Sequence, residues 1–416
     1  MESMGEAGQR RVPDSQRKGP RPLMLHLSLA QTIWRGSSAA WPSWNSGWQN
    51  LNPALRAEEE ALRLELLRAE ADPAAAADAL ERQVRKRQRE LLDGIEAYRR
   101  HPYRRALEDP PVLWSEGSAR LLDYGGSGPP LLLVPSLINR GYILDLSETC
   151  SLARWLAESG FRVFLLDWGT PGEIERGFSL TDYIAGYLEA SLDALRSETG
   201  QNPLLVGYCM GGLLALAAAQ RRAEDLRGLV LLATPWDFHA IPGQAALGRA
   251  ALMTWGPLMD LMGELPVDVL QSLFTMVDPM ATIRKFRNFA ALDPESEQAR
   301  AFVALEDWLN DGVPLAAPVA RECLGAWYAG NTTQMGAWRI AGRRVLPQRI
   351  ELPTLCVIPA EDRIVPPASA LALAEALPNV DVQRPKAGHI GMVAGRSAAS
   401  RIWGPLRDWM RDKAVS

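Results

Sequence analysis

The sequence is poor in cysteine and histidine and has no surplus of positive charge, and these scarcities exclude several classes of protein. Four cysteines in 416 residues cannot form the disulfide framework of a secreted scaffold, so we expect a reducing, cytoplasmic setting. Lys and Arg total 45 against 49 Asp and Glu, which argues against nucleic acid as the main partner. No apolar run reaches the length of about 18 residues that a membrane span requires.

The four histidines and four cysteines also lack the spacing of metal ligands, so we expect no metal site. No glycine-rich loop of the kind that binds a dinucleotide or a phosphate is present, so we expect no resident cofactor. The 47% apolar and 23% charged residues are typical of an ordinary globular protein.

Composition divides the chain into four predicted parts. Residues 1–54 are polar and then rich in tryptophan, and we predict a disordered tail followed by a loop. Residues 55–110 are rich in helix-forming Ala, Leu, Glu and Arg and are predicted to be a helical segment. Residues 111–234 and 351–416 form the predicted catalytic core, and residues 235–350 a helical insertion that caps it.

Four tryptophans lie between residues 34 and 48 in a stretch without helical or strand period: Trp34, Trp41, Trp44 and Trp48. Aromatic side chains that cannot pack within their own segment often mark a binding site. We therefore expect residues 1–52 to be dispensable for chemistry and to contribute to association with a hydrophobic surface. The alternative is that the tryptophans fold back onto the catalytic domain.

The predicted core alternates short apolar runs with helical patterns. Apolar runs suited to strands buried on both faces occupy residues 131–135, 161–167, 203–206, 228–233, 354–358 and 380–384. Helical patterns occupy residues 152–160, 179–195, 210–222 and 366–377, and another begins at 398. This alternation predicts an α/β fold with a mostly parallel, doubly wound sheet of the α/β-hydrolase type, with the helical insertion and an N-terminal helical extension.

The clearest chemical motif is Gly207-Tyr208-Cys209-Met210-Gly211-Gly212, which follows one predicted strand and precedes a helix. It matches the nucleophile elbow G-x-S-x-G with cysteine in place of serine. A thiolate at a helix N-terminus is favoured by the helix dipole. We therefore predict Cys209 as the nucleophile, and a buried, inert thiol as the alternative.

A nucleophile of this kind needs a base and an acid, which follow it in chain order in this fold. Asp362 follows the predicted strand at 354–358, and His389 follows the next strand. We predict Cys209, Asp362 and His389 as a catalytic triad, with Glu361 as the rival acid. The oxyanion hole should use the backbone N–H of Met210 and a second donor from the loop 135–139, for which Leu137 is the candidate, although the sequence does not single it out.

The chain resembles the polyhydroxyalkanoate synthases over roughly residues 90–410. The resemblance rests on the elbow motif, Asp167-Trp168-Gly169, Gly388-His389-Ile390-Gly391 and five further segments. These are Val134 to Leu146, Ser151 to Leu156, Trp327 to Asn331, Gly342 to Arg344, and Asp362 to Pro366. It implies that Cys209 is the acylated nucleophile, His389 the base, and Asp362 the acid that orients His389 or helps to activate the incoming hydroxyl.

The resemblance also implies an activity: polymerisation of 3-hydroxyacyl-coenzyme A into polyester at cytoplasmic granules, with release of coenzyme A. The coenzyme A thioester is then a substrate, and the expected partners are the polymer granule, a second copy of the chain in a homo-oligomer and an accessory subunit. Two alternatives stay open. One is a cysteine hydrolase, either a thioesterase or a depolymerase, and the other is a granule protein without activity.

Overall fold

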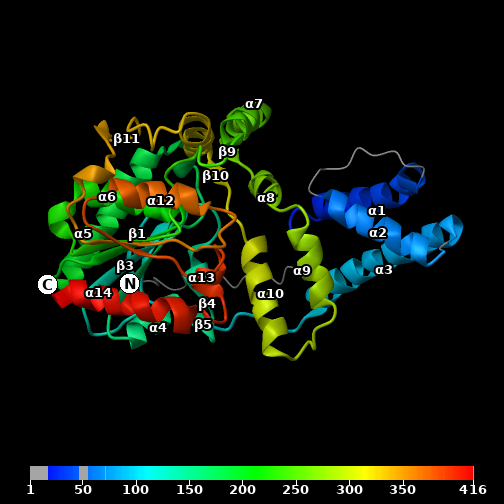
Figure 1. Ribbon diagram of the computed structural model, residues 1–416. Helices are drawn as coiled ribbons and strands as arrows, with labels where there is room; N and C mark the ends of the chain where they lie inside the picture. The colour runs from blue at the N-terminus through cyan, green and yellow to red at the C-terminus, as the bar shows by residue number, and fades with distance from the viewer. Residues whose placement is uncertain (1–16, 46–54, 71, 416) are drawn as a thin grey trace. The chain divides into compact units, whose positions relative to one another are not determined.

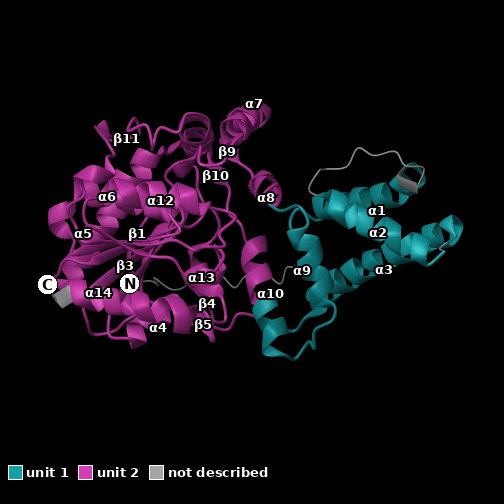
Figure 2. Ribbon diagram, in the orientation of Figure 1, with its two compact units in different colours: residues 1–103, 278–303 teal, residues 104–277, 304–416 magenta. Residues whose placement is uncertain are grey.

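The computed structural model describes residues 17–45, 55–70 and 72–415, which divide into two compact units (Figure 2). Unit 1 comprises residues 1–103 and 278–303, and unit 2 comprises residues 104–277 and 304–416. Among the described residues, none of the helices combines the length and the apolar character needed to span a membrane.

Unit 2 is built on a sheet of eight strands in the order β1-β2-β6-β3-β7-β8-β13-β14 (Figure 1). From β6 to β14 all neighbours are parallel, whereas β1, β2 and β6 pair antiparallel. The strands are β1 Val112–Glu116, β2 Ala119–Asp123, β3 Pro130–Val134, β6 Arg162–Asp167, β7 Leu204–Tyr208, β8 Gly228–Leu232, β13 Thr354–Val357 and β14 Val380–Gln383. The predicted fold class is confirmed.

Helices cover both faces of this sheet (Figure 1). On one face lie α5 Glu189–Thr199, α6 Met210–Arg221 and α12 Pro367–Ala376, and on the other lie α4 Leu152–Glu158 and α14 Gly404–Val415. Strands β3, β7 and β8 are buried along their whole length, as their continuous apolar runs predict. Ten consecutive residues of α6, Met210 to Ala219, are buried as well, so the helix that begins at the elbow lies deep in the core of unit 2.

The helical pattern at 179–195 begins with hydrogen bonds between Ser179 and Asp182. The backbone N–H and hydroxyl of Ser179 both donate to Asp182 Oδ2, at 2.8 and 2.6 Å. The helix runs on through η4 Asp182–Leu188 into α5.

The predicted insertion at 235–350 is not one body. Residues 278–303 belong to unit 1, because Ile283, Phe286 and Phe289 of α9 pack into the core of that unit. The helices of this region are α7 Gln244–Met262, α8 Val267–Thr275, α9 Ala281–Phe289, α10 Glu297–Asn310, α11 Ala317–Arg321, η6 Glu322–Ala329 and η7 Pro347–Arg349. Its short strands are β9 Glu264–Leu265, β10 Leu315–Ala316, β11 Arg339–Ile340 and β12 Arg343–Arg344.

Short elements complete unit 2 around the ends of the strands. They are η2 Gly141–Leu144, β4 Asp145–Ser147, β5 Cys150–Ser151, η3 Glu175–Gly177, η5 Ala223–Asp225, α13 Gly391–Ala394 and η8 Ala399–Trp403. Asp145 is fully buried here and is satisfied by Arg105, Arg154, Tyr124 and Ser151. This network holds the β4–β5 hairpin without leaving a buried charge unpaired.

The described part of unit 1 is helical, and it includes part of the predicted tail. Its helices are α1 Leu23–Asn45, α2 Arg56–Arg68, α3 Pro73–Arg100 and α9. Asp72 caps α3 by accepting a hydrogen bond of 3.1 Å from the N–H of Ala75, and Pro73 is its first residue.

The prediction of a loop around the tryptophans is wrong for residues 23–45, which form α1. Ala30 and Trp34, four residues apart, lie in one buried cluster with Leu91 and Ile95 of α3 and Phe286 of α9. Trp41 donates to the carbonyl oxygen of Pro73 at 3.3 Å. Trp48 and residues 1–16 lie outside the described residues. Trp34 therefore packs into the core of unit 1, so its expected exposure is wrong, and this contact is not the alternative of packing onto the catalytic domain.

Replacement of Trp34 by alanine should lower the stability of unit 1 by about 3–5 kcal/mol, because Trp34 is 3% exposed and its loss opens a cavity between α1 and α3. Hydrogen exchange of the α1 and α3 amides measures the change. Trp41→Ala is the matched control, since Trp41 is only half-buried, and it should cost much less. Equal losses in the two variants would contradict a core role for Trp34.

Candidate active site

Cys209 lies at the turn between β7 and α6, in a strained backbone conformation. Its φ is 58° and its ψ −126°, a combination that residues with a side chain rarely adopt. Such a turn directs the side chain away from both the strand and the helix. The sequence prediction of an elbow at residues 207–212 thus corresponds to an observed backbone feature, and the thiol is partly exposed.

The glycines around Cys209 are required because neighbouring atoms approach their backbone too closely for a side chain. A Cβ on Gly207 would lie 2.4 Å from the Cα of Gly212, and one on Gly212 would lie 1.8 Å from Thr234 Oγ1. A Cβ on Gly211 would lie 2.2 Å from the carbonyl oxygen of Val134, at the end of β3. The start of α6 therefore packs directly against the end of β3, which brings the loop after β3 beside the elbow.

Replacement of Gly211 by alanine should displace α6 from β3 and cost about 1–3 kcal/mol, with loss of Cys209 reactivity, because the clash is with a backbone carbonyl that cannot rotate away. Melting temperature and the rate of Cys209 alkylation measure the two effects. Gly186→Ala is the control, since nothing lies within 4 Å of the added Cβ in that helix. The expectation is overturned if the two variants behave alike.

The structure brings Asp362 and His389 together. His389 Nδ1–H donates to Asp362 Oδ2 at 2.7 Å, and both residues are buried. Asp362 Oδ1 accepts from the N–H groups of Ile364 and Val365 at 2.8 and 2.9 Å, which fixes the carboxylate. Both residues follow strands as predicted, Asp362 after β13 and His389 after β14.

The electrostatics of His389 favour its charged form. Burial by itself would lower the pKa of His389, but the charge of Cys209 and the hydrogen bonds with Asp362 and Cys209 outweigh burial and raise the pKa to about 10. Cys209, His389 and Asp362 therefore form one connected chain of groups. A thiolate beside an imidazolium is the arrangement that makes a cysteine nucleophilic near neutral pH.

Glu361, the rival acid, lies elsewhere. Its side chain is 57% exposed and points to Lys386, with 3.9 Å between Oε1 and Nζ. His26 and His101 belong to unit 1, and His239 Nε2 lies 2.9 Å from the carbonyl oxygen of Tyr328. Among the described residues, no group of three or more His, Cys, Asp or Glu side chains could hold a metal ion.

Two aromatic residues that the sequence analysis missed hold the His389 loop in place. The ring of Tyr208 packs on the imidazole, with 5.2 Å between centroids and 32° between planes, and its hydroxyl donates to the carbonyl oxygen of His389 at 3.3 Å. Burial raises the pKa of Tyr208 well above its usual value, so the phenol keeps its proton. Trp403 donates to the carbonyl oxygen of Met392 at 3.1 Å. The position of Tyr208 beside the nucleophile was its only signal in the sequence.

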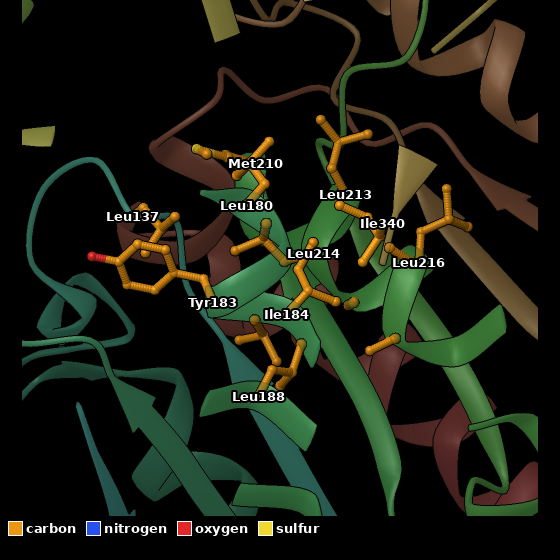
Figure 3. Close-up of a cluster of buried hydrophobic side chains, with 14 of the residues drawn as sticks. Leu137, Leu180, Tyr183, Ile184, Leu188, Met210, Leu213, Leu214, Leu216 and Ile340 are labelled. Atoms are coloured by element: carbon orange, nitrogen blue, oxygen red, sulfur yellow. The ribbon is translucent and has the colours of Figure 1, made fainter. Parts of the chain in front are cut away.

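Among the described residues, the N–H groups of Met210 and Leu137, the two predicted donors, have no acceptor, and neither do those of the adjacent Gly211 and Ser136. Met210 is the first residue of α6, where helical N–H groups lack an internal partner. In the loop after β3, the N–H of Ile138 donates to Ser136 Oγ at 3.0 Å, whereas the N–H of Leu137 has no acceptor. Figure 3 shows the side chains of Leu137 and Met210 at one end of a buried cluster that also includes residues of η4 and α6.

Comparisons with known proteins identify the fold and the family of the chain. A family model described as the alpha/beta hydrolase fold matches residues 129–395. The poly(3-hydroxyalkanoate) polymerase subunit PhaC of Haloferax mediterranei is 30% identical over 321 residues, which are 73% of this chain and 64% of that protein. The protein of the same name from a Synechocystis species is 30% identical over 295 residues, covering 68% of this chain and 78% of that protein.

Among solved structures, a bromoperoxidase from Bacillus anthracis is similar with a TM-score of 0.47 and 17% identity, over 71% of this chain and 95% of that one. The matched region of the family model contains all three predicted triad residues, Cys209, Asp362 and His389. It does not include α1, α2 or α3 of unit 1.

Proposed function

Since the chain belongs to the poly(3-hydroxyalkanoate) polymerase family, within the alpha/beta hydrolase fold, we propose that it polymerises 3-hydroxyacyl groups from coenzyme A thioesters into a polyester. The observation that carries the proposal is a cysteine in the place of serine at the nucleophile elbow, connected to a buried His389–Asp362 pair. The chain spans about two thirds of the length of the Haloferax relative, 64%.

In the first half of the reaction, the Cys209 thiolate attacks the thioester carbonyl of the substrate. The carbonyl oxygen becomes an oxyanion, for which the unbonded N–H groups of Met210 and Leu137 are the proposed donors. The intermediate collapses by breaking the bond between carbon and the coenzyme A sulfur, and the imidazolium of His389 supplies the proton of the departing thiol. The acyl group is then held on Cys209 as a new thioester.

In the second half, His389, now neutral, accepts the proton of a chain-end hydroxyl that attacks the acyl-Cys209. A second oxyanion forms and collapses, Cys209 leaves as thiolate, and the new ester bond lengthens the polymer by one unit. The thiolate–imidazolium pair is thereby restored. Asp362 keeps the imidazole oriented through both halves by accepting from Nδ1–H.

Cysteine suits this chemistry better than serine for an energetic reason. Exchange of one thioester for another is nearly neutral in free energy, so the acyl group stays activated on the enzyme. Transfer from thioester to a hydroxyl then forms the more stable ester and is favourable. A serine nucleophile would form an ordinary ester in the first step and lose this driving force before the polymer grows.

Assay of coenzyme A release from 3-hydroxybutyryl-coenzyme A, with and without isolation of insoluble polymer, tests the proposal. We expect coenzyme A and polymer to appear together. Release of coenzyme A with free 3-hydroxybutyrate and no polymer would identify a hydrolase instead. Absence of any release would leave a protein without this activity.

We propose the remaining partners on the strength of the family alone. The relatives are named as polymerase subunits, which supports an accessory subunit, and a polymer product supports association with the granule in the cytoplasm. A homo-oligomer is part of the same proposal. Sedimentation of the protein with and without polymer measures both associations.

A further inference from the structure

The loop that follows β3 is held by side chains from the insertion. Trp308 of α10 donates its indole N–H to the carbonyl oxygen of Arg140 at 2.7 Å. Gln271 of α8 donates to Asn139 Oδ1 at 2.9 Å and also to the carbonyl oxygen of Leu309 at 3.3 Å. The remaining support comes from the core, where Trp168 donates to the carbonyl oxygen of Pro135 at 3.0 Å.

Gln271 is unusual among these anchors because it is a polar side chain, 8% exposed, whereas the other buried residues of its helix, Val267, Val269 and Leu270, are apolar. Buried amides are retained where their hydrogen bonds are satisfied, and this amide bridges two segments that are far apart in the sequence. Gly312 lies at the same junction, since an added Cβ there would be 2.5 Å from Val267 and 3.4 Å from both amide groups. The contact between α8 and the loop is therefore tightly packed.

Asn139, the acceptor, has a φ of 65°, in the left-handed region that few residues other than glycine adopt. A side-chain hydrogen bond is one means of holding such a conformation, because it lowers the energy of the bend relative to its alternatives. Leu137, with the unbonded N–H, stands two residues earlier in the same bend. The direction of that N–H depends on how the bend is held.

We propose that Gln271 is a positioning residue for the reaction at Cys209. By binding Asn139, it holds the loop after β3 in the bend that presents the Leu137 N–H to the oxyanion, opposite the Met210 N–H. This inference rests on the proposed function, because the role it gives Gln271 exists only if Cys209 attacks a thioester. It gives α8, which belongs to the predicted insertion, a part in building the site.

Loss of the hydrogen bond between Gln271 and Asn139 should lower kcat more than it raises KM. An oxyanion exists only in the transition state and the intermediates, so a misplaced donor weakens binding there and leaves binding of the ground-state thioester almost unchanged. Removal of a whole oxyanion donor costs about 10²–10³-fold in kcat, and a displaced donor costs part of that. For Gln271→Met, which keeps the side-chain length but donates no hydrogen bond, we expect kcat to fall by about 10–100-fold, with KM within about threefold.

Asn139→Gly provides a second, independent variant. Glycine adopts a positive φ without cost, so this variant removes the acceptor without straining the backbone. It should lower kcat as Gln271→Met does. In the double variant the two losses should not multiply, since each single change already breaks the same hydrogen bond.

Initial rates of coenzyme A release from 3-hydroxybutyryl-coenzyme A are measured for all variants and are normalised to the fraction of Cys209 that an alkylating reagent titrates. Gln220→Met is the matched control: Gln220 bonds the backbone at Arg344 and Leu346, at 2.8 and 2.6 Å, at the far end of α6. An unchanged kcat in Gln271→Met, a loss equal to that of the control, or multiplying losses in the double variant overturns the inference. An inactive wild-type chain would instead overturn the proposed function.

Discussion

Replacement of Cys209 by alanine should reduce the release of coenzyme A by on the order of 10⁴-fold or more, because no other group can form the covalent thioester. The folded structure should survive. Alanine is smaller than cysteine, meets the same backbone requirement at φ 58°, and leaves the glycine contacts of the elbow unchanged. The change thus isolates the sulfur atom from the architecture that holds it.

The measurement is the initial rate of coenzyme A release, together with the melting temperature and mass spectrometry of the acylated protein. Cys150→Ala is the matched control, since Cys150 is also a partly exposed free thiol but lies on β5. We expect acylation of wild type and Cys150→Ala and none of Cys209→Ala. Normal turnover in Cys209→Ala would remove the whole mechanism, the proposed role of Gln271 included.

The sequence predicts well those strands whose burial shows in their own run of residues. Strand β3 was expected at 131–135 and occupies Pro130–Val134, and β6 was expected at 161–167 and occupies Arg162–Asp167. Both are buried on two faces, so each reads as an unbroken apolar run. The antiparallel β1–β2 hairpin was not predicted, because much of β1 is exposed and its side chains are mixed.

Helix α1 was not predicted because its buried face includes a polar residue. His26 is only 3% exposed and lies on the same helix as Ala30 and Trp34. A histidine in that position interrupts the apolar pattern, although the ring is accommodated with its Nε2 3.3 Å from the carbonyl oxygen of Arg21. The partner of this face, in α9, lies some 250 residues further along the chain, where no local pattern could indicate it.

In the candidate site, too, local features could be predicted and contacts between distant segments could not. The elbow is a local feature, and chain order in the fold then places an acid and a base on the loops after later strands, which led to Asp362 and His389. The sequence does not show whether Leu137 or Ile138 is the donor. That depends on which N–H bonds to Ser136 Oγ in the folded loop. Gln271 had no signal in the sequence, since it reaches Asn139 across 132 residues.

Replacement of Asp362 by asparagine should slow coenzyme A release by about 10²–10⁴-fold. The amide has almost the same shape as the carboxylate but carries no charge, and it can present N–H where His389 Nδ1–H needs an acceptor. The imidazole then turns or changes tautomer. Glu361→Gln is the matched control, because Glu361 is exposed and, within the described part of the chain, pairs only with Lys386; its rate should stay within about twofold.

The same variant should lower the pKa of His389. In the wild type that pKa is about 10, although burial opposes it, because the charge of Cys209 and the hydrogen bond to Asp362 favour the imidazolium. Without the carboxylate one of these contributions is lost, so the imidazolium should give up its proton at a lower pH and the alkaline limb of the rate profile should move in the same direction. With four histidines in the chain, nuclear magnetic resonance of ring-labelled histidine can follow His389 directly. A larger effect on rate or pKa from Glu361→Gln than from Asp362→Asn would show that the acid was assigned to the wrong carboxylate.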